Sequence, residues 1–95
     1  MTEKAVYRRG AVLWRCTYDR VLILVPGEEG FLSLQGTGRD LWDVLEEPGT
    51  LDELAARLAG IYTAPAGRIA SEIVNVIEEL ERRGAVVSAH PRDGL

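Results

Sequence analysis

The sequence predicts an α+β domain in which a three-stranded antiparallel sheet is followed by three helices. Two observations support this prediction. Short runs of β-branched and aromatic residues alternate with turn residues up to residue 35, whereas apolar residues recur at helical spacing beyond it. The length of 95 residues suits one domain. We therefore expect a single domain over residues 1–95, with flexible ends at about 1–6 and 89–95.

The strands are predicted as a meander. Residues 12–17 (VLWRCT) and 21–25 (VLILV) are separated by a Tyr-Asp dipeptide with turn chemistry, which indicates a hairpin. A second turn at residues 26–30 (PGEEG) leads into the short run FLSL at 31–34. We expect this last strand to lie at the edge of the sheet.

Three helices are predicted at residues 38–47, 51–62 and 66–83, followed by a short extended wing at 85–88. A glycine after the third helix suits the left-handed position that ends a helix. The first two helices each follow a Ser/Thr-x-x-acid capping pattern. The residues of these patterns are Thr37 with Asp40, and Thr50 with Glu53.

Helical periodicity predicts which residues reach the core. On the first helix these are Leu41, Trp42 and Leu45. The third helix has an apolar arc wider than a surface helix needs, of about 160° at 100° per residue. Its core stripe is predicted as Ile69, Ile73, Val76 and Leu80, and its apolar flank as Ala70, Val74 and Ile77, next to Glu78. This flank either meets the first helix or the wing, or forms one wall of an exposed groove.

The residues that carry enzyme chemistry are scarce. The single histidine, His90, lies in the tail, and the single cysteine, Cys16, lies in a predicted strand, where we expect a buried side chain. Neither has a companion at metal-ligand spacing, and no nucleophile–base pair is evident. We expect a protein that is not an enzyme and that uses no cofactor and no metal.

The charges argue against a nucleic-acid partner. Residues 1–20 carry a net charge of +3, and the remaining residues carry −7. Affinity for DNA or RNA depends on clustered Lys and Arg, which the predicted helices lack. No apolar run approaches the roughly 20 residues of a membrane span, and no secretory signal opens the chain. We expect a cytoplasmic protein that binds neither nucleic acid nor membrane.

The short strand offers a site for a peptide. With a side-chain period of two, Leu32 and Leu34 face the core, while Phe31, Ser33 and Gln35 face outward. An open edge can pair with another chain, and the apolar flank of the third helix would receive alternate side chains of that chain. The alternative is an edge that nothing uses.

An ordered set of residues over 31–87, with the preceding hairpin, resembles the PqqD family. The set is Phe31-Leu-x-Leu34, Thr37-Gly38, Leu41-Trp42-x-x-Leu45, Thr50 to Leu54, Leu58, Tyr62, and Ile77-x-x-Leu80-x-x-x-Gly84-Ala85-Val86. The resemblance implies a winged helix-turn-helix-like domain that recognises ribosomally synthesised, post-translationally modified peptides (RiPPs). Such a domain binds the leader of the precursor as an extra strand beside its third strand, here residues 31–35, and against its third helix, here residues 66–83. Gln35 stands where the family often has asparagine.

The edge-strand argument and the resemblance together give the expected peptide-binding residues. They are Gly30, Phe31, Leu32, Ser33, Leu34, Gln35, Ala70, Ile73, Val74, Ile77 and Glu78. A freestanding domain of this kind resembles the recognition subunit of lasso-peptide systems, which implies a leader peptide, a separate leader peptidase and possibly a cyclase as partners.

Two other functions stay open at this point. One is a peptide chaperone for a radical enzyme in the biosynthesis of pyrroloquinoline quinone (PQQ). The other, from a different class, is a winged helix-turn-helix DNA-binding regulator with helix three as the reader. Helix three carries a net charge of −1, which disfavours contact with DNA.

Overall fold

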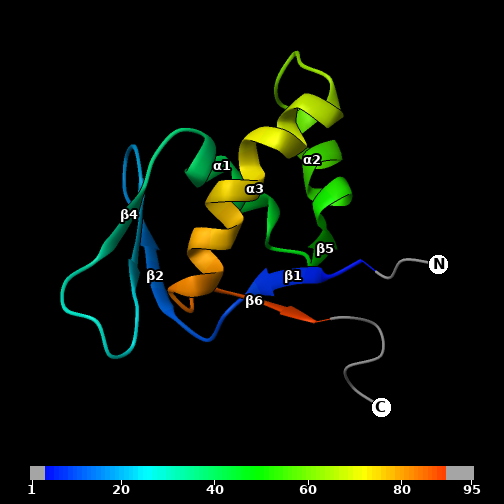
Figure 1. Cartoon of the computed structure of the whole chain (residues 1–95). Coiled ribbons are helices and arrows are strands. Elements are labelled where there is room, and N and C mark those ends of the chain that lie inside the picture. Colours follow the sequence, from blue (N-terminus) through cyan, green and yellow to red (C-terminus); the bar gives the residue numbers. More distant parts are fainter. Residues whose placement is uncertain (1–3, 90–95) are drawn as a thin grey trace.

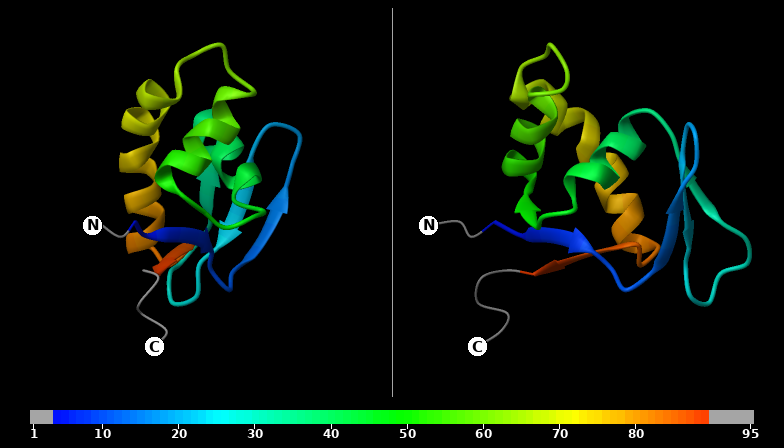
Figure 2. Two further views of the ribbon diagram at one scale, coloured as in Figure 1. Left: turned by 90° about the vertical axis from the view of Figure 1, so that its right-hand side faces the viewer. Right: turned by 180° about the vertical axis from the view of Figure 1, so that it is seen from behind.

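The computed structural model describes residues 4–89, in which two small sheets pack against three helices, one sheet beside them and the other at one end (Figures 1 and 2). The elements in chain order are β1 (Val6–Arg9), β2 (Leu13–Cys16), β3 (Val21–Leu24), β4 (Leu32–Leu34), α1 (Thr37–Val44), β5 (Gly49–Thr50), α2 (Leu51–Ala59), α3 (Ala66–Arg82) and β6 (Val86–Ala89). The predicted α+β class, with a three-stranded antiparallel sheet and three helices, is confirmed.

The predicted meander is the sheet β2-β3-β4. Its strands pair antiparallel, with Val21 opposite both Cys16 and Leu34. Strand β4 pairs with β3 alone in the described chain, so the prediction of an edge strand is confirmed. One face of this sheet packs against the helices, and in Figure 2 (right) its other face points away from them.

A second sheet, β5-β1-β6, was not predicted. Strand β1 pairs along its length with β6, from Val6 opposite Ala89 to Arg9 opposite Val86, and also with β5. Val6 and Ala89 were expected within flexible ends, but each pairs in this sheet; residues 1–3 and 90–95 of those ends lie outside the described residues. The run VYRR is too polar to be recognised as a strand from its own residues. It forms a strand by pairing with β6, which lies about eighty residues further along the chain.

The two predicted capping patterns differ in outcome. At α2, the Thr50 hydroxyl accepts from the Glu53 amide at 3.2 Å and the Glu53 carboxylate accepts from the Thr50 amide at 2.8 Å, which confirms a complete capping box. At α1 the prediction was wrong. The N-cap is Gly36, at a positive φ, with no side-chain cap, and the Asp40 carboxylate instead accepts a hydrogen bond from the Tyr62 hydroxyl.

The first two helices end earlier than predicted, at Val44 and Ala59 rather than at 47 and 62. Arg57 of α2 donates to the carbonyl oxygens of Val44, Glu47 and Pro48. These hydrogen bonds satisfy carbonyl groups at the end of α1 and just after it, where the backbone is no longer helical. Helix α3 ends within one residue of the prediction.

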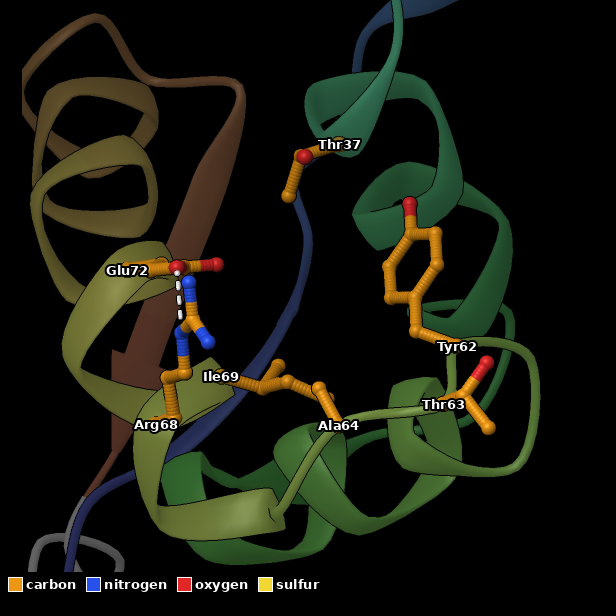
Figure 3. A pocket seen from close by; sticks show the side chains of 7 residues that line it. All are labelled: Thr37, Tyr62, Thr63, Ala64, Arg68, Ile69 and Glu72. Atoms are coloured by element: carbon orange, nitrogen blue, oxygen red, sulfur yellow. Dashed lines mark hydrogen bonds and ion pairs between the residues drawn. The ribbon is translucent and has the colours of Figure 1, made fainter.

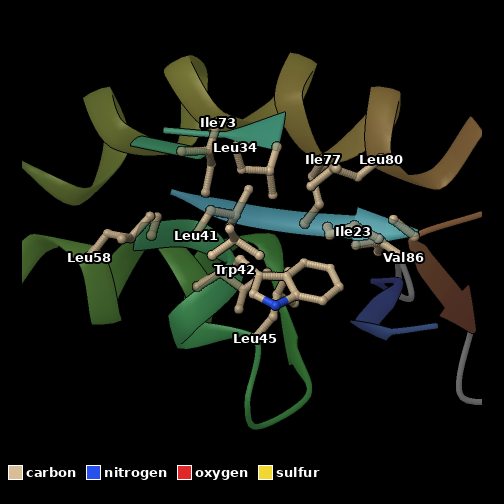
Figure 4. Close-up of a cluster of buried hydrophobic side chains, with 14 of the residues drawn as sticks. Ile23, Leu34, Leu41, Trp42, Leu45, Leu58, Ile73, Ile77, Leu80 and Val86 are labelled. Carbon is tan, nitrogen blue, oxygen red and sulfur yellow. The ribbon is translucent and has the colours of Figure 1, made fainter. Parts of the chain in front are cut away.

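The core lies between the β2-β3-β4 sheet and the helices (Figure 4). Leu41, Trp42 and Leu45 are each at most 1% exposed, which confirms their prediction as core residues. The stripe on α3 requires a correction, since Ile77 is fully buried and Val76 is only partly buried. Because Ile69, Ile73 and Leu80 remain buried as predicted, the buried face of α3 is displaced only slightly around the helix axis, toward Ile77. The helix packs against α2 and, near its end, against β6.

Cys16 is exposed, contrary to the prediction, because all four residues of the edge strand β2 are exposed. Within residues 4–89, no helix has both the length and the apolar character to cross a bilayer.

Candidate functional site

The edge strand β4 has the predicted alternation of side chains. Leu34 is buried and Leu32 packs partly against the core, whereas Ser33 and Gln35 are exposed and Phe31 is 66% exposed. The backbone on the free side of β4 pairs with no other strand of the described chain. This edge is therefore open to pairing with an additional strand.

One flank of α3 lies toward β4, as contacts at both of its ends show. At the C-terminal end, Arg83 donates to Glu28 in the turn that precedes β4, at 2.6 Å. At the N-terminal end, Arg68 and Glu72 line one pocket together with Thr37, which follows β4. Helix α3 thus runs antiparallel to β4 and beside it.

We call the surface between the free edge of β4 and this flank of α3 the β4–α3 face. Val76 follows Glu72 by one helical turn and is half-buried, so it supplies apolar surface to the middle of the flank. Beneath it, Leu34 and Ile73 belong to one buried cluster (Figure 4). The face is therefore apolar in its middle and charged at both ends.

The opposite flank of α3 turns toward the β5-β1-β6 sheet. Burial, and then the charges of Glu81 and Glu78, raise the pKa of Tyr7 on β1, and the Glu81 carboxylate accepts from the Ser88 hydroxyl of β6. Val74 precedes Glu78 by one turn and therefore shares this flank.

The predicted helix residues thus divide, since Ile73 shares a buried cluster with Leu34 of β4 whereas Val74 and Glu78 lie on the opposite flank. Three of them, Ala70, Val74 and Glu78, share the flank that turns toward β1 and β6, while Ile73 and Ile77 are fully buried. The helical periodicity showed how wide the apolar arc is, but not which neighbour each side of it meets. The charged pair Glu28–Arg83, fifty-five residues apart, has no local signal in the sequence.

A pocket of about 290 Å³ lies at the Thr37 end of the β4–α3 face (Figure 3). Arg68 and Glu72 form an ion pair at 3.3 Å on one wall. Tyr62 stands on the opposite wall, and burial, followed by the hydrogen bond to Asp40, raises the pKa of its hydroxyl. The complete lining is Thr37, Tyr62, Thr63, Ala64, Arg68, Ile69 and Glu72.

The outer face of the β2-β3-β4 sheet carries apolar side chains. Leu13 is 72% exposed and Leu24 is 41% exposed, and the two stand opposite each other in the sheet. With Phe31 they border a hollow of about 180 Å³, which is also lined by Trp14, Arg15 and Leu22. Apolar patches on monomers seldom exceed several hundred Å², and those at the upper end are often binding sites.

The described residues form no metal centre. Within residues 4–89, no three His, Cys, Asp or Glu side chains cluster in a way that would hold a metal ion. The candidate site consists of an open strand edge, a helix flank and an apolar sheet face.

Comparison with protein families identifies a related family. The model of the family described as "Coenzyme PQQ synthesis protein D (PqqD)" matches residues 20–86, well over half of the chain. The matched segment holds β3, β4, β5, the three helices and the first residue of β6. Comparisons with curated proteins and with solved structures gave no match.

Proposed function

The chain belongs to the PqqD family of RiPP recognition elements, and from this premise we propose that it binds the leader of a precursor peptide at the β4–α3 face. In the finer proposal, the leader is that of a lasso peptide, and the domain delivers it to a separate leader peptidase. The domain supplies binding and the peptidase supplies the chemistry.

One observation carries the proposal, namely the unpaired edge of β4 beside a helix flank. An added strand would satisfy the backbone groups of this edge, and its alternate side chains would point toward α3. Val76 and Leu32 are only partly buried and would close over those side chains. Backbone pairing is nearly independent of sequence, so the helix flank would provide the selectivity.

The proposed site keeps the strand residues predicted from the sequence, which are Gly30, Phe31, Leu32, Ser33, Leu34 and Gln35. On α3 and at the residue that follows it, the proposed site uses Glu72, Val76 and Arg83, on the side toward β4, in place of Ala70, Val74 and Glu78. The side-chain amide of Gln35 donates to the Asp19 carboxylate at 3.2 Å, so this side chain already joins the end of β4 to the β2–β3 turn.

The outer face of the β2-β3-β4 sheet is the surface that we assign to the partner enzyme. Phe31 lies at the border between this face and the edge of β4, so an enzyme seated on the outer face would also reach the bound leader. Apolar area of this kind, with Arg15 beside it, suits a protein surface that is apolar and carries an acidic group.

Calorimetric titration of a synthetic leader, combined with amide hydrogen exchange, tests the binding step. The precursor would be identified from a short reading frame adjacent to this gene and a peptidase gene. Leader binding should slow exchange along Leu32–Leu34. Saturable binding without added protection in β4 would contradict strand addition, and absence of binding would contradict the function itself.

The family description favours a second candidate, a peptide chaperone in PQQ synthesis. This role would use the same β4–α3 face but a different partner, a radical enzyme. Pull-down of the two enzyme classes by the leader-bound domain distinguishes them. A DNA-binding role is disfavoured, since α3 exposes Glu72, Glu78, Glu79 and Glu81.

A further inference from the structure

Arg83 has an unused hydrogen-bond donor at one end of the β4–α3 face. Its Nη2 donates to Glu28 Oε1 at 2.6 Å, but its Nε is buried and has no partner among the described residues. Buried donors are almost always satisfied, so an orphaned one calls for an explanation. A guanidinium presents Nε and Nη2 as a fork that fits the two oxygens of a carboxylate. Glu28 occupies only one prong of this fork.

The turn that carries Glu28 has a glycine at each end. Gly27 and Gly30 flank the two glutamates of the turn, with φ angles of 85° and 79° that favour glycine. The backbone contact of this turn is a 3.2 Å hydrogen bond from the Glu28 amide to the Val25 carbonyl. The Glu28 and Arg83 side chains are each more than a third exposed, so their ion pair exchanges at little cost.

We propose that Arg83 is a carboxylate-binding subsite for the leader and that Glu28 is its internal placeholder. This inference rests on the proposed function. In the free protein, Glu28 covers the subsite through one oxygen. In the complex, an Asp or Glu of the leader takes both Nε and Nη2 of Arg83, and the turn that carries Glu28 moves aside.

The geometry also places the acidic residue within the leader. Every pairing in the β2-β3-β4 sheet is antiparallel, and a leader that continues this order runs opposite to β4. Its C-terminal part then lies beside the start of β4, where Arg83 is located. The acidic residue should therefore follow the apolar residues that pack on Val76 and Leu32.

A selection experiment tests this inference even while the leader sequence is unidentified. A display library of random peptides, long enough to span β4 and its flanking turns, is selected on the wild-type chain, Arg83→Gln and Glu28→Gln. Arg82→Gln and Glu29→Gln serve as matched controls. Arg82 pairs with Glu79 rather than with Glu28, and Glu29 makes no ion pair with any described residue.

Peptides selected on the wild type should carry an acidic residue at a fixed distance after their apolar positions, and selection on Arg83→Gln should lose that preference. A chosen peptide should bind about tenfold more weakly when its acidic residue is changed to the amide, and this difference should vanish in Arg83→Gln. Glu28→Gln should bind the acidic peptide several-fold more tightly than the wild type. A purely structural role for Arg83 would not make the effect of the acid-to-amide change in the peptide depend on whether residue 83 is arginine or glutamine.

The outcomes separate the inference from the proposed function. If the wild type enriches no peptides with alternating apolar residues, the leader-binding function is contradicted. If it enriches such peptides without a fixed acidic position, or if Arg83→Gln keeps that position, the function stands and the subsite is overturned.

Discussion

Arg9 donates two hydrogen bonds to the carbonyl oxygen of Trp42, from Nε at 3.1 Å and from Nη2 at 2.6 Å. Its guanidinium carbon also lies 4.6 Å from the ring centroid of Trp14 and 5.0 Å from that of Trp42. The Trp42 carbonyl is in the last turn of α1, where carbonyl groups lack helical partners. One side chain of β1 thus joins the second sheet to α1 and to β2.

Arg9→Gln should lower the free energy of unfolding by about 1.5–3 kcal/mol, because it removes charge-assisted hydrogen bonds to a part-buried carbonyl. Urea titration followed by circular dichroism measures the loss. Arg8→Gln is the matched control, since Arg8 is the exposed neighbour on β1. Equal effects of the two changes would show that Arg9 does not fasten the sheets.

Trp42→Ala should cost about 3–5 kcal/mol, because it empties the site of the largest fully buried side chain. For a domain of this size, that approaches the whole stability. Trp14 packs edge-on against Trp42 but is 42% exposed, so Trp14→Ala should cost much less. A thermal melt of Trp42→Ala that matches the wild type would contradict the core assignment.

Val76→Glu and Val74→Glu form a matched pair on the two flanks of α3, and both valines are half-buried. Val76→Glu should weaken binding of the synthetic leader at least tenfold, about 1.4 kcal/mol, because it places a charge on the β4–α3 face. Val74→Glu should leave the affinity nearly unchanged. Calorimetric titration of both folded variants decides between the flanks, and the reverse result would move the leader to the flank predicted from the sequence.

The outer sheet face can be tested separately from leader binding. Leu13→Ser and Leu24→Ser should leave leader affinity unchanged but abolish most of the acceleration of leader removal by the peptidase, because they weaken docking of the enzyme. Cleavage of the full precursor is followed with and without each variant. Unimpaired acceleration by both variants would exclude this face as the docking surface.

The capping box of α2 should make stability depend on pH. Hydrogen bonds from Thr50, first from its backbone amide and then from its side chain, hold the pKa of Glu53 below its ordinary value. A carboxylate whose pKa is lowered on folding stabilises the folded state at pH values above the ordinary glutamate pKa. This stabilisation is lost as the pH falls through the lower pKa of the folded state. Glu53→Gln should therefore melt below the wild type at pH 7, and the two Tm values should converge as the pH falls below the folded-state pKa of Glu53. A constant difference in Tm would contradict the role of the charge.

Local patterns in the sequence were sufficient for most of the fold. The alternation of residues 31–34 predicted that Leu34 is buried and that Phe31 is exposed, and the spacing of Leu41, Trp42 and Leu45 predicted a buried helix face. Such patterns reflect interactions within a few residues of the chain, such as side-chain alternation and helix capping. The strand edge of the candidate site was predictable for the same reason.

Tertiary packing decided the rest. Strand β1 exists because β6 returns to pair with it, and Cys16 is exposed because it lies on β2, an edge strand whose four residues are all exposed. Likewise, the slight displacement of the buried face of α3 leaves Val76 rather than Ile77 at its surface. Each outcome depends on contacts between residues far apart in the sequence, and these contacts form only when the whole domain has folded. The sequence by itself therefore determined that α3 has a broad apolar arc, whereas its neighbours decided which flank faces β4.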